Sequence, residues 1–237
     1  MTSRALLLAA SLACSTSLEA QFLIIPTTGH ASSGWGFDVG GQLVRPVGEF
    51  REHVPLAWGI GASARYSLWR SPLSLRTDMT WLNYGNESRR VPLSTSVNRV
   101  MVDMRTSNNI ALFYGGPEFA LEVGPLHPYV HGFAGYSYFY TESSAAGRHQ
   151  EDFASSTNFS DGGLVTGWGG GMRVPVSSRR HNVAIDAGAR FTRAGTRTYL
   201  TRGDVQDQPD GSLTFTPRTS TTDFWQAHFG ATFSSRR

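Results

Sequence analysis

The sequence predicts an all-β protein, a closed antiparallel up-and-down transmembrane β-barrel of about eight strands. Apolar and polar residues alternate along about eight segments, most of them longer than the roughly five or six residues typical of strands in soluble proteins. Beyond the N-terminal segment no run of about eighteen apolar residues occurs, so any membrane crossing would have to be made by strands. Short and long connections alternate between the segments.

The N-terminus is expected to carry a cleaved export signal over residues 1–20. Arg4 supplies a positive charge, a short apolar core follows it, and Ala20 is a small residue before the cleavage point. Residues 21–33 would form a periplasmic segment, and residues 34–237 the barrel. Cys14 is the only cysteine and would leave with the signal, although a lipid-modified cysteine is an alternative.

The first four predicted strands each combine an uncharged, largely apolar face with a mixed one. We place them at residues 34–46, 56–69, 73–85 and 106–123. Pro117 falls inside the fourth and would fit there if it marks a β-bulge. Their uncharged faces hold Trp35, Phe37, Val39 and Leu43; Trp58, Ile60, Ala62 and Tyr66; Leu73, Leu75, Met79 and Trp81; and Ala111, Phe113 and Phe119.

The last four strands, predicted at residues 128–141, 162–176, 181–198 and 222–235, repeat this division. None of the positions assigned to the apolar face is charged. These faces hold Val130, Ala134, Tyr136 and Tyr138; Leu164, Trp168, Met172 and Val174; Val183, Ile185, Ala187 and Phe191; and Trp225, Ala227, Phe229 and Phe233.

Charged residues of the strands share the opposite faces, which would line the lumen. Four carboxylates and four guanidiniums could pair there and leave the bore neutral and plugged. The predicted lumen ion pairs are drawn from Asp38, Asp78, Glu118 and Asp186 with Arg65, Arg76, Arg173 and Arg190.

The connections predict which end of the barrel faces outward. Those at 70–72, 124–127 and 177–180 are short, whereas those at 86–105, 142–161 and 199–221 are long and polar. Outer-membrane barrels have tight periplasmic turns and longer outside loops. The first outside connection, 47–55, is a short exception.

Aromatic residues near the strand ends are expected at the two membrane interfaces, where amphipathic rings favour the headgroup level. The outer set is Trp58, Trp81, Tyr138, Tyr140 and Trp225, and the periplasmic set is Trp35, Tyr66, Phe119, Tyr129 and Phe233.

Three stretches give the chain a resemblance to small bacterial outer-membrane barrels of the OmpA/OmpX type. They are Gly34-Trp35-Gly36-Phe37-Asp38-Val39-Gly40-Gly41, residues 128–140 with their closing Gly-Tyr-Ser-Tyr-Phe-Tyr, and residues 224–233. The resemblance covers about residues 30–235 and implies a location in the outer membrane, contact with its lipid and lipopolysaccharide, and insertion by the barrel-assembly machinery. Such barrels usually end on an aromatic residue, whereas Phe233 is followed here by Ser234-Ser235-Arg236-Arg237.

The sequence shows no strong catalytic signature, since it contains neither a G-x-S-x-G nor an H-E-x-x-H motif. His131 and His228 share the inward parity and could act in a lipid A-modifying enzyme, but histidines satisfied by hydrogen bonds are commoner. Residues 149–152 (His-Gln-Glu-Asp) and the glycine-rich 167–171 are better explained as a solvated loop and a thinned strand. Four arginines make the second outside loop basic: Arg89, Arg90, Arg99 and Arg105.

We therefore predict a non-enzymatic integral outer-membrane barrel, monomeric and without a cofactor or metal, whose loops make any specific contacts. The formal net charge of +3 and the scattered arginines do not indicate nucleic-acid binding. Eight strands leave an interior just filled by side chains, which disfavours a general porin. The alternatives are a lipid A-modifying outer-membrane enzyme and a soluble periplasmic ligand-binding barrel.

Overall fold

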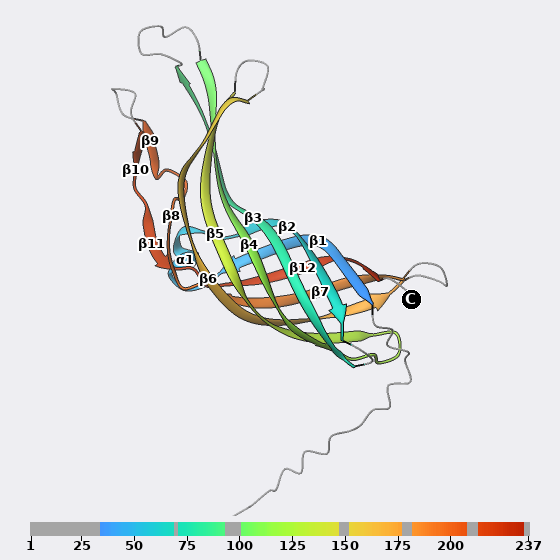
Figure 1. The fold of residues 1–237 in the computed structure, drawn as a ribbon. Helices are drawn as coiled ribbons and strands as arrows, with labels where there is room; N and C mark the ends of the chain where they lie inside the picture. The colour runs from blue at the N-terminus through green and yellow to red at the C-terminus, as the bar shows by residue number, and fades with distance from the viewer. Residues whose placement is uncertain are drawn as a thin grey trace, which may run out of the picture.

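Eight strands close into one antiparallel barrel in the computed structural model, which describes residues 34–68, 71–92, 101–146, 152–176, 182–207 and 213–234 (Figure 1). The predicted fold class is confirmed. The predicted signal and periplasmic segment, residues 1–33, lie outside the described residues. The barrel strands are β1 (Trp35–Pro46), β2 (Ala57–Ser67), β3 (Leu73–Pro92), β4 (Met101–Ala120), β5 (His127–Ala146), β6 (Asp152–Pro175), β7 (Asn182–Arg193) and β12 (Phe224–Ser234).

Closure is made by the first and last strands. β1 pairs with β12 from Gly36 opposite Ser234 to Pro46 opposite Phe224, and its other edge pairs with β2. Every barrel strand therefore has two neighbours, as the order β1-β12-β7-β6-β5-β4-β3-β2 requires. A closed barrel pairs its backbone groups internally, which is what allows strands to cross a bilayer.

Period-two alternation sorts side chains to the two surfaces of the wall. In β1, Val39 and Leu43 are more than half exposed, whereas Gln42 and Val44 between and beside them are buried. The outward apolar residues of β1 run from Trp35 to Leu43, and those of β12 from Trp225 to Phe233. Each run spans about nine residues, the length with which a tilted strand crosses the hydrocarbon layer. The outside of the wall is thus apolar and its inside largely polar.

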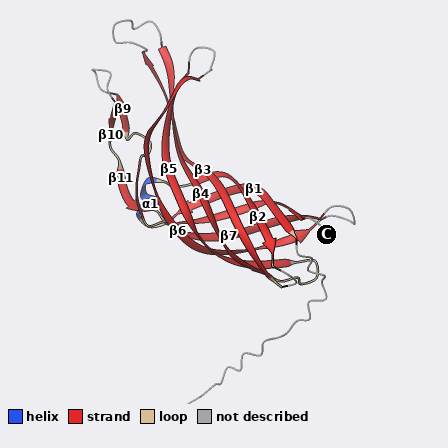
Figure 2. Ribbon diagram, viewed as in Figure 1, coloured by secondary structure: helices blue, strands red, loops and turns tan. Residues whose placement is uncertain are grey.

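One side of the wall extends well beyond the other. β3, β4 and β5 have 20 residues each and β6 has 24, against 11 or 12 in β1, β2, β7 and β12. Figures 1 and 2 show these four strands rising and twisting away from the barrel. We call this extension the outer sheet and define it by residues 84–92, 101–109, 140–146 and 152–163. The prediction of long loops at 86–105 and 142–161 was wrong over most of both ranges.

The last outside connection also contains strands. β8 (Thr196–Tyr199) pairs with β11 (Arg218–Thr221), and β9 (Val205–Asp207) pairs with β10 (Leu213–Phe215). We call residues 194–223 the outer arm. The predicted single strand 181–198 is therefore divided: β7 ends at Arg193, and Gly195 has a φ of 67°, a left-handed conformation that a side chain would disfavour.

The first outside connection holds α1 (Glu49–His53), a five-residue helix. No helix within the described ranges is long and apolar enough to cross a membrane. Pro117 does not mark a bulge, because β4 pairs with β5 in the same register on both sides of it, at Gly115 opposite Ala134 and Glu118 opposite His131. The break between β3 and β4 lies instead between Asn83 and Gly85.

Candidate functional site

The predicted lumen residues all lie on the inside of the barrel. They come from six strands: Asp38 from β1, Arg65 from β2, Arg76 and Asp78 from β3, Glu118 from β4, Arg173 from β6, and Asp186 and Arg190 from β7. We call this set the bore cluster. Its four carboxylates balance its four guanidiniums, which limits the penalty of burying so many charges.

Glu118 collects three of the arginines. Arg173 donates from both terminal nitrogens to the two carboxylate oxygens at 2.8 and 2.7 Å, and Arg76 donates to Glu118 Oε2 at 3.0 Å. Arg65 Nη1 lies 3.7 Å from Glu118 Oε1. The Glu118 side chain is fully buried, so these contacts replace all of its hydration. Such two-pronged, charge-assisted hydrogen bonds are among the strongest in proteins.

A second centre forms around Asp78. Arg76 donates to its two oxygens at 2.9 Å each, and Arg190 donates to Oδ1 at 3.1 Å. The other terminal nitrogen of Arg190 donates to Gln42 Oε1 at 3.3 Å, which also accepts from Gln226 Nε2 at 2.9 Å. Neutral glutamines thereby connect the charged residues of β3 and β7 to β1 and β12.

Asp186 is held by Tyr129, His228 and Arg173. Tyr129 donates its hydroxyl hydrogen to Asp186 Oδ1 at 2.8 Å, and His228 Nε2 lies 2.9 Å from that hydroxyl and 3.5 Å from Oδ1. The Arg173 guanidinium lies 3.8 Å from the centroid of the Tyr129 ring, in a cation–π contact. Tyr129 is therefore inside the barrel, and its prediction as a periplasmic interface residue was wrong, because its alternation places it with His131 and opposite the exposed Val130.

Asp38 stands apart from the arginines. It accepts hydrogen bonds from Ser63 and Thr232, and no ion pair is formed by it among the described residues. The structure thus brings seven of the eight predicted charges into contact and leaves the eighth on hydroxyl groups.

Glycines in this part of the wall let neighbouring strands approach one another closely. Gly61, Gly40 and Gly230 lie in one row across β2, β1 and β12. A Cβ on Gly40 would lie 2.4 Å from the carbonyl oxygen of Phe229, and one on Gly230 would lie 2.2 Å from that of Val39. A cavity of only about 20 Å³ remains beside them, about the space of one water molecule. The bore is therefore closed at this level.

The outer mouth of the barrel is closed by aromatic rings. Phe50 from α1 is fully buried, and its ring centroid lies 5.2 Å from Tyr199 of the outer arm, 6.0 Å from Phe139 and 6.3 Å from Tyr84. The Tyr84 hydroxyl donates to the carbonyl oxygen of Leu200 at 3.1 Å. We call these four rings the mouth cluster. The sequence analysis missed this cluster because it assigned aromatic residues to the outside of the wall. The positions of Tyr84 and Phe139, which alternate with outward residues, could have indicated that their rings face inward.

An ion pair joins the two halves of the outer arm to each other between its two pairs of strands. Arg218 donates from Nε and Nη2 to Asp204, at 3.1 Å from both Oδ2 and Oδ1, and Thr201 donates from its amide and hydroxyl at 2.8 and 2.7 Å. Burial raises the pKa of the Asp204 carboxyl, but the hydrogen bonds from Arg218 and Thr201 lower it more, so the net pKa lies below its ordinary value. The contacts that hold the two halves of the arm together are thus strongest while Asp204 is ionised.

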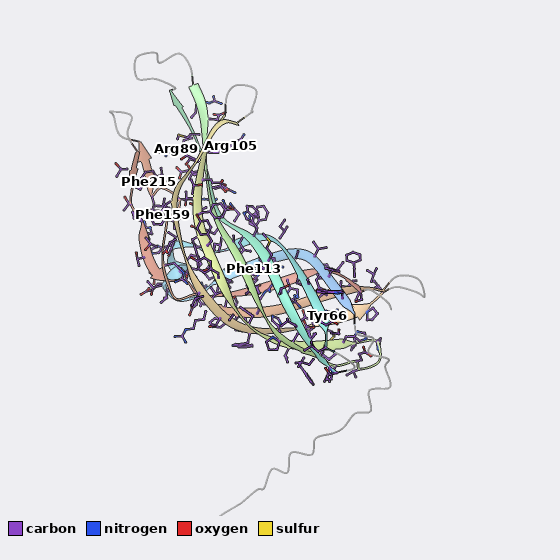
Figure 3. The ribbon with its side chains drawn as sticks, viewed as in Figure 1. Tyr66, Arg89, Arg105, Phe113, Phe159 and Phe215 are labelled. Atoms are coloured by element: carbon purple, nitrogen blue, oxygen red, sulfur yellow. The ribbon has the colours of Figure 1, made fainter. Side chains whose placement is uncertain are left out.

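The predicted interface aromatics lie on the outside of the wall in contacting groups. Trp35 stacks near Phe37 and Tyr66 at one end, and Phe233 is half exposed there. At the other end Trp58 packs edge-on against Trp81, whose Nε1 donates to the Tyr140 hydroxyl at 3.0 Å. Figure 3 labels Tyr66 near one end of the barrel and Phe113 on its wall. Tyr138 stacks on Tyr140, and Trp225 packs against Trp168.

The other candidate residues do not assemble into a reactive site. His131 has no hydrogen-bond partner for either ring nitrogen within the described ranges, and its ring lies 5.8 Å from that of Phe133. Residues 149–151 and Arg99 lie outside the described residues. The part of the chain that the structure describes contains no group of three or more His, Cys, Asp or Glu side chains placed to hold a metal ion.

No protein-family model matches the chain, and no curated protein sequence is significantly similar to it. Solved structures do show similarity. The outer membrane protein OprG of Pseudomonas aeruginosa aligns with a TM-score of 0.47 at 13% identity, over 88% of this chain and 99% of that one. A major outer membrane protein of Thermus thermophilus gives 0.46 at 11%, over 85% and 99%. The attachment invasion locus protein Ail of Yersinia pestis gives 0.44 at 12%, over 86% and 100%.

Three features of the molecule indicate the environment for which it is built. Its strands close without a free edge in the wall, its outside is an apolar belt of membrane-crossing height, and its inside is a packed set of paired charges. Closed barrels with lipid-facing apolar bands and aromatic girdles are built for the outer membrane. The chain is a small eight-stranded outer-membrane β-barrel.

Proposed function

We propose that the chain is a non-enzymatic, non-conducting scaffold of the outer membrane, which presents the outer sheet and the outer arm for contacts outside the cell. One observation carries the proposal: the bore is closed at two levels by chemically different sets of side chains. The bore cluster fills the interior between the strands, and the mouth cluster seals the outer end. A barrel of eight strands has an interior that side chains can fill completely.

The soluble ligand-binding alternative does not fit this surface. A soluble barrel would keep its apolar side chains inside, whereas Ile60, Phe113 and Phe229 are each more than 60% exposed on the outside. Contiguous apolar surface of this extent requires a nonpolar surrounding. The wall therefore supports a lipid environment.

The lipid A-modifying alternative would need a reactive group at the lipid-facing surface. Tyr129, Asp186 and His228 form a hydrogen-bonded trio, but Tyr129 and Asp186 are 3% and 1% exposed inside the bore and the His228 side chain is 7% exposed. A lipid on the outside of the wall would be separated from them by the strands. The trio is better explained as part of the bore cluster.

Two measurements test the proposal on the purified protein in membranes. In planar lipid bilayers we expect no single-channel current from the wild type, whereas Phe50→Ser combined with Arg76→Ser and Arg190→Ser should conduct. Regular channel openings by the wild type would contradict the closed bore. In a second assay, mass spectrometry of lipid A after incubation with the protein should show unchanged masses, and a changed mass that depends on His228 would overturn the non-enzymatic role.

Further proposals concern the partners. Insertion by the barrel-assembly machinery, contact with lipopolysaccharide and a monomeric state are each compatible with a closed barrel that has an apolar outside. Depletion of the machinery in cells, with recovery of the protein from the membrane fraction as the readout, tests the first. Mass measurement in detergent tests the monomer.

A further inference from the structure

The outer sheet carries two polar rows on the face that continues the lipid-facing side of the barrel. Across β3, β4 and β5, Asn86 lies opposite Ser107, which lies opposite Glu142, and the next row outward is Ser88, Arg105 and Ser144. These residues alternate with Thr106, Asn108, Thr141 and Ser143, which are buried on the other face. The two rows therefore share one solvent-facing surface.

A hollow of about 490 Å³ lies over these rows. Its lining consists of the six residues of the two polar rows together with Glu87 and Thr106, which alternate with them along β3 and β4. All eight residues are polar or charged. Its volume falls in the range of about 300–1,000 Å³ that is usual for small-ligand sites. Figure 3 shows Arg105 where the outer sheet twists above the barrel.

Two charged groups of this hollow have no partner among the described residues. Neither Arg105 nor Glu142 forms an ion pair or a side-chain hydrogen bond with any residue that the structure describes, although they lie in adjacent rows on neighbouring strands. Other charges nearby are paired: Arg90 lies 3.0 Å from Asp103, and Arg89 lies 3.7 Å from Glu87. The hollow thus keeps one strong donor and one strong acceptor free.

The floor of the hollow is a rigid network of amides and hydroxyls. The side-chain nitrogen of Asn83 lies 3.0 Å from both Asn86 Oδ1 and Ser107 Oγ and 3.1 Å from Asn109 Oδ1. Asn83 and Asn109 are almost fully buried. Asn86 and Ser107 are therefore fixed in place at the lower edge of the hollow, which is the preorganisation that a weakly held ligand needs.

We propose that this hollow binds a neutral saccharide. A sugar hydroxyl both donates and accepts, so a ring with neighbouring hydroxyls can pair at once with the Glu142 carboxylate and the Arg105 guanidinium. The Glu142 carboxylate shares the hollow with the Arg105 guanidinium, and its negative charge disfavours a phosphate group there. Ser88 and Ser144 flank Arg105 with further hydroxyls.

The position in the membrane indicates where the saccharide comes from. Trp81, Tyr138 and Tyr140 lie on the same face, one to two rows nearer the hydrocarbon layer, and such rings mark the headgroup level. The hollow lies just outside that level, beside the sugars of an outer-leaflet glycolipid. This inference rests on the part of the proposed function that places the outer sheet outside the cell. It does not depend on whether the bore is closed.

Binding is tested with the protein in phospholipid nanodiscs that contain no glycolipid. The probe is the dephosphorylated core oligosaccharide of lipopolysaccharide, titrated and followed by saturation-transfer NMR; inorganic phosphate is titrated separately. We expect saturable binding of the oligosaccharide, and Arg105→Ala and Glu142→Gln should each raise the Kd about tenfold, since each removes a hydrogen bond to a charged group. Arg45→Ala, an exposed outward arginine of β1 outside the hollow, should leave the Kd unchanged.

Each result decides the matter. Absence of saturable oligosaccharide binding, equal binding by all four proteins, or saturation by phosphate alone overturns the proposal. A second arm with intact lipopolysaccharide, measured by native mass spectrometry, separates the sources: retention that weakens in Arg105→Ala supports the membrane glycolipid, whereas binding of the free oligosaccharide alone places the saccharide outside the leaflet. The bilayer conductance of the wild type tests the closed bore separately, so its result does not affect the conclusion on saccharide binding.

Discussion

Arg173 on β6 holds Glu118 on β4 with both terminal nitrogens of its guanidinium, at 2.8 and 2.7 Å from the two carboxylate oxygens, so the contact reaches past β5. Glu118 is fully buried and Arg173 is 4% exposed. Charges this deep are stable only when their partners are present, because neither can regain its hydration in place. The pair therefore links β4 to β6 across the bore, and each of its two charges depends on the other.

Replacing Glu118 with glutamine should destabilise the barrel by about 3–5 kcal/mol, because Arg173 and Arg76 would lose a buried counter-charge. The free energy of unfolding is measured by urea titration of protein refolded into lipid bilayers.

The double variant Glu118→Gln/Arg173→Gln is the control for this prediction. We expect it to be less destabilised than the sum of the two single variants, since removing both partners leaves no orphaned charge in that pair. Additive losses would show that the two residues stabilise the barrel independently.

A side chain should be tolerated at position 41 but not at position 40, where the neighbouring strand leaves no space for it. A Cβ on Gly40 would lie 2.4 Å from the backbone oxygen of Phe229, which cannot move aside, whereas a Cβ on Gly41 would meet nothing within 4 Å. We expect Gly40→Ala to destabilise the barrel by about 1–3 kcal/mol. Gly41→Ala should be neutral or slightly stabilising, and the same urea titration compares the two. Equal stability of both variants would mean that β1 and β12 approach less closely at Gly40.

The strands inside the membrane could be predicted from the sequence, because lipid imposes strict alternation. Val39 and Leu43 had to face hydrocarbon, and the charged Asp38, Arg76 and Asp78 had to face away from it. This physical constraint ends at the headgroup level. Residues 86–90 carry polar side chains on both faces of the outer sheet, so no apolar–polar alternation was visible there and they were predicted as part of a loop.

The bore and mouth clusters were predictable only in part. Alternation along the strands predicted that the eight charges lie inside the barrel. It could not predict which carboxylate each arginine contacts, since that depends on the register between the strands. Phe50 lies in a short connection and Tyr199 lies in the outer arm. Neither belongs to a membrane strand, so no alternation pattern could predict that their side chains are buried together. Their meeting depends on tertiary folding alone.

An arginine on the outward face at mid-height should cost about 2–4 kcal/mol of stability in a bilayer. Val39 is 54% exposed and lies in the middle of the apolar run of β1. Val39→Arg is therefore predicted to refold poorly into bilayers. Thr196→Arg, at an exposed position of β8 beyond the apolar run, should match the wild type. Equal refolding yields and stabilities of the two variants would contradict the facing assigned to β1.

Closure of the outer arm should weaken in acid. The folded-state pKa of Asp204 is lowered, so its contribution to arm stability is complete above the ordinary value of about 3.8 and is lost as the pH falls through the lower, folded-state pKa. The Thr201 amide donates to Asp204 Oδ2 at 2.8 Å, and its NMR resonance should shift with a midpoint below 3.8.

The variant Asp204→Asn checks the assignment of this titration. It removes the ionisable group but keeps an oxygen that can accept from Thr201, so the acid-dependent shift should disappear while the arm stays partly closed. A midpoint above 3.8 in the wild type would mean that burial, rather than Arg218, dominates at this carboxyl.

Truncating the ring of Phe50 should loosen the mouth without opening the bore. Phe50 is fully buried against Tyr199, Phe139 and Tyr84, and loss of such a ring costs about 3–5 kcal/mol of packing. We expect faster hydrogen exchange in α1 and β8 of Phe50→Ala. Exchange at residues 36–39 of β1 and 231–234 of β12 should be unchanged, because these residues lie at the end of the barrel away from the mouth cluster. Phe215→Ala, at a ring that is 37% exposed on β10, should leave the exchange in α1 as in the wild type. Since the bore cluster still fills the barrel below, Phe50→Ala should also remain silent in planar bilayers, and current through this single variant would show that the mouth cluster alone closes the barrel.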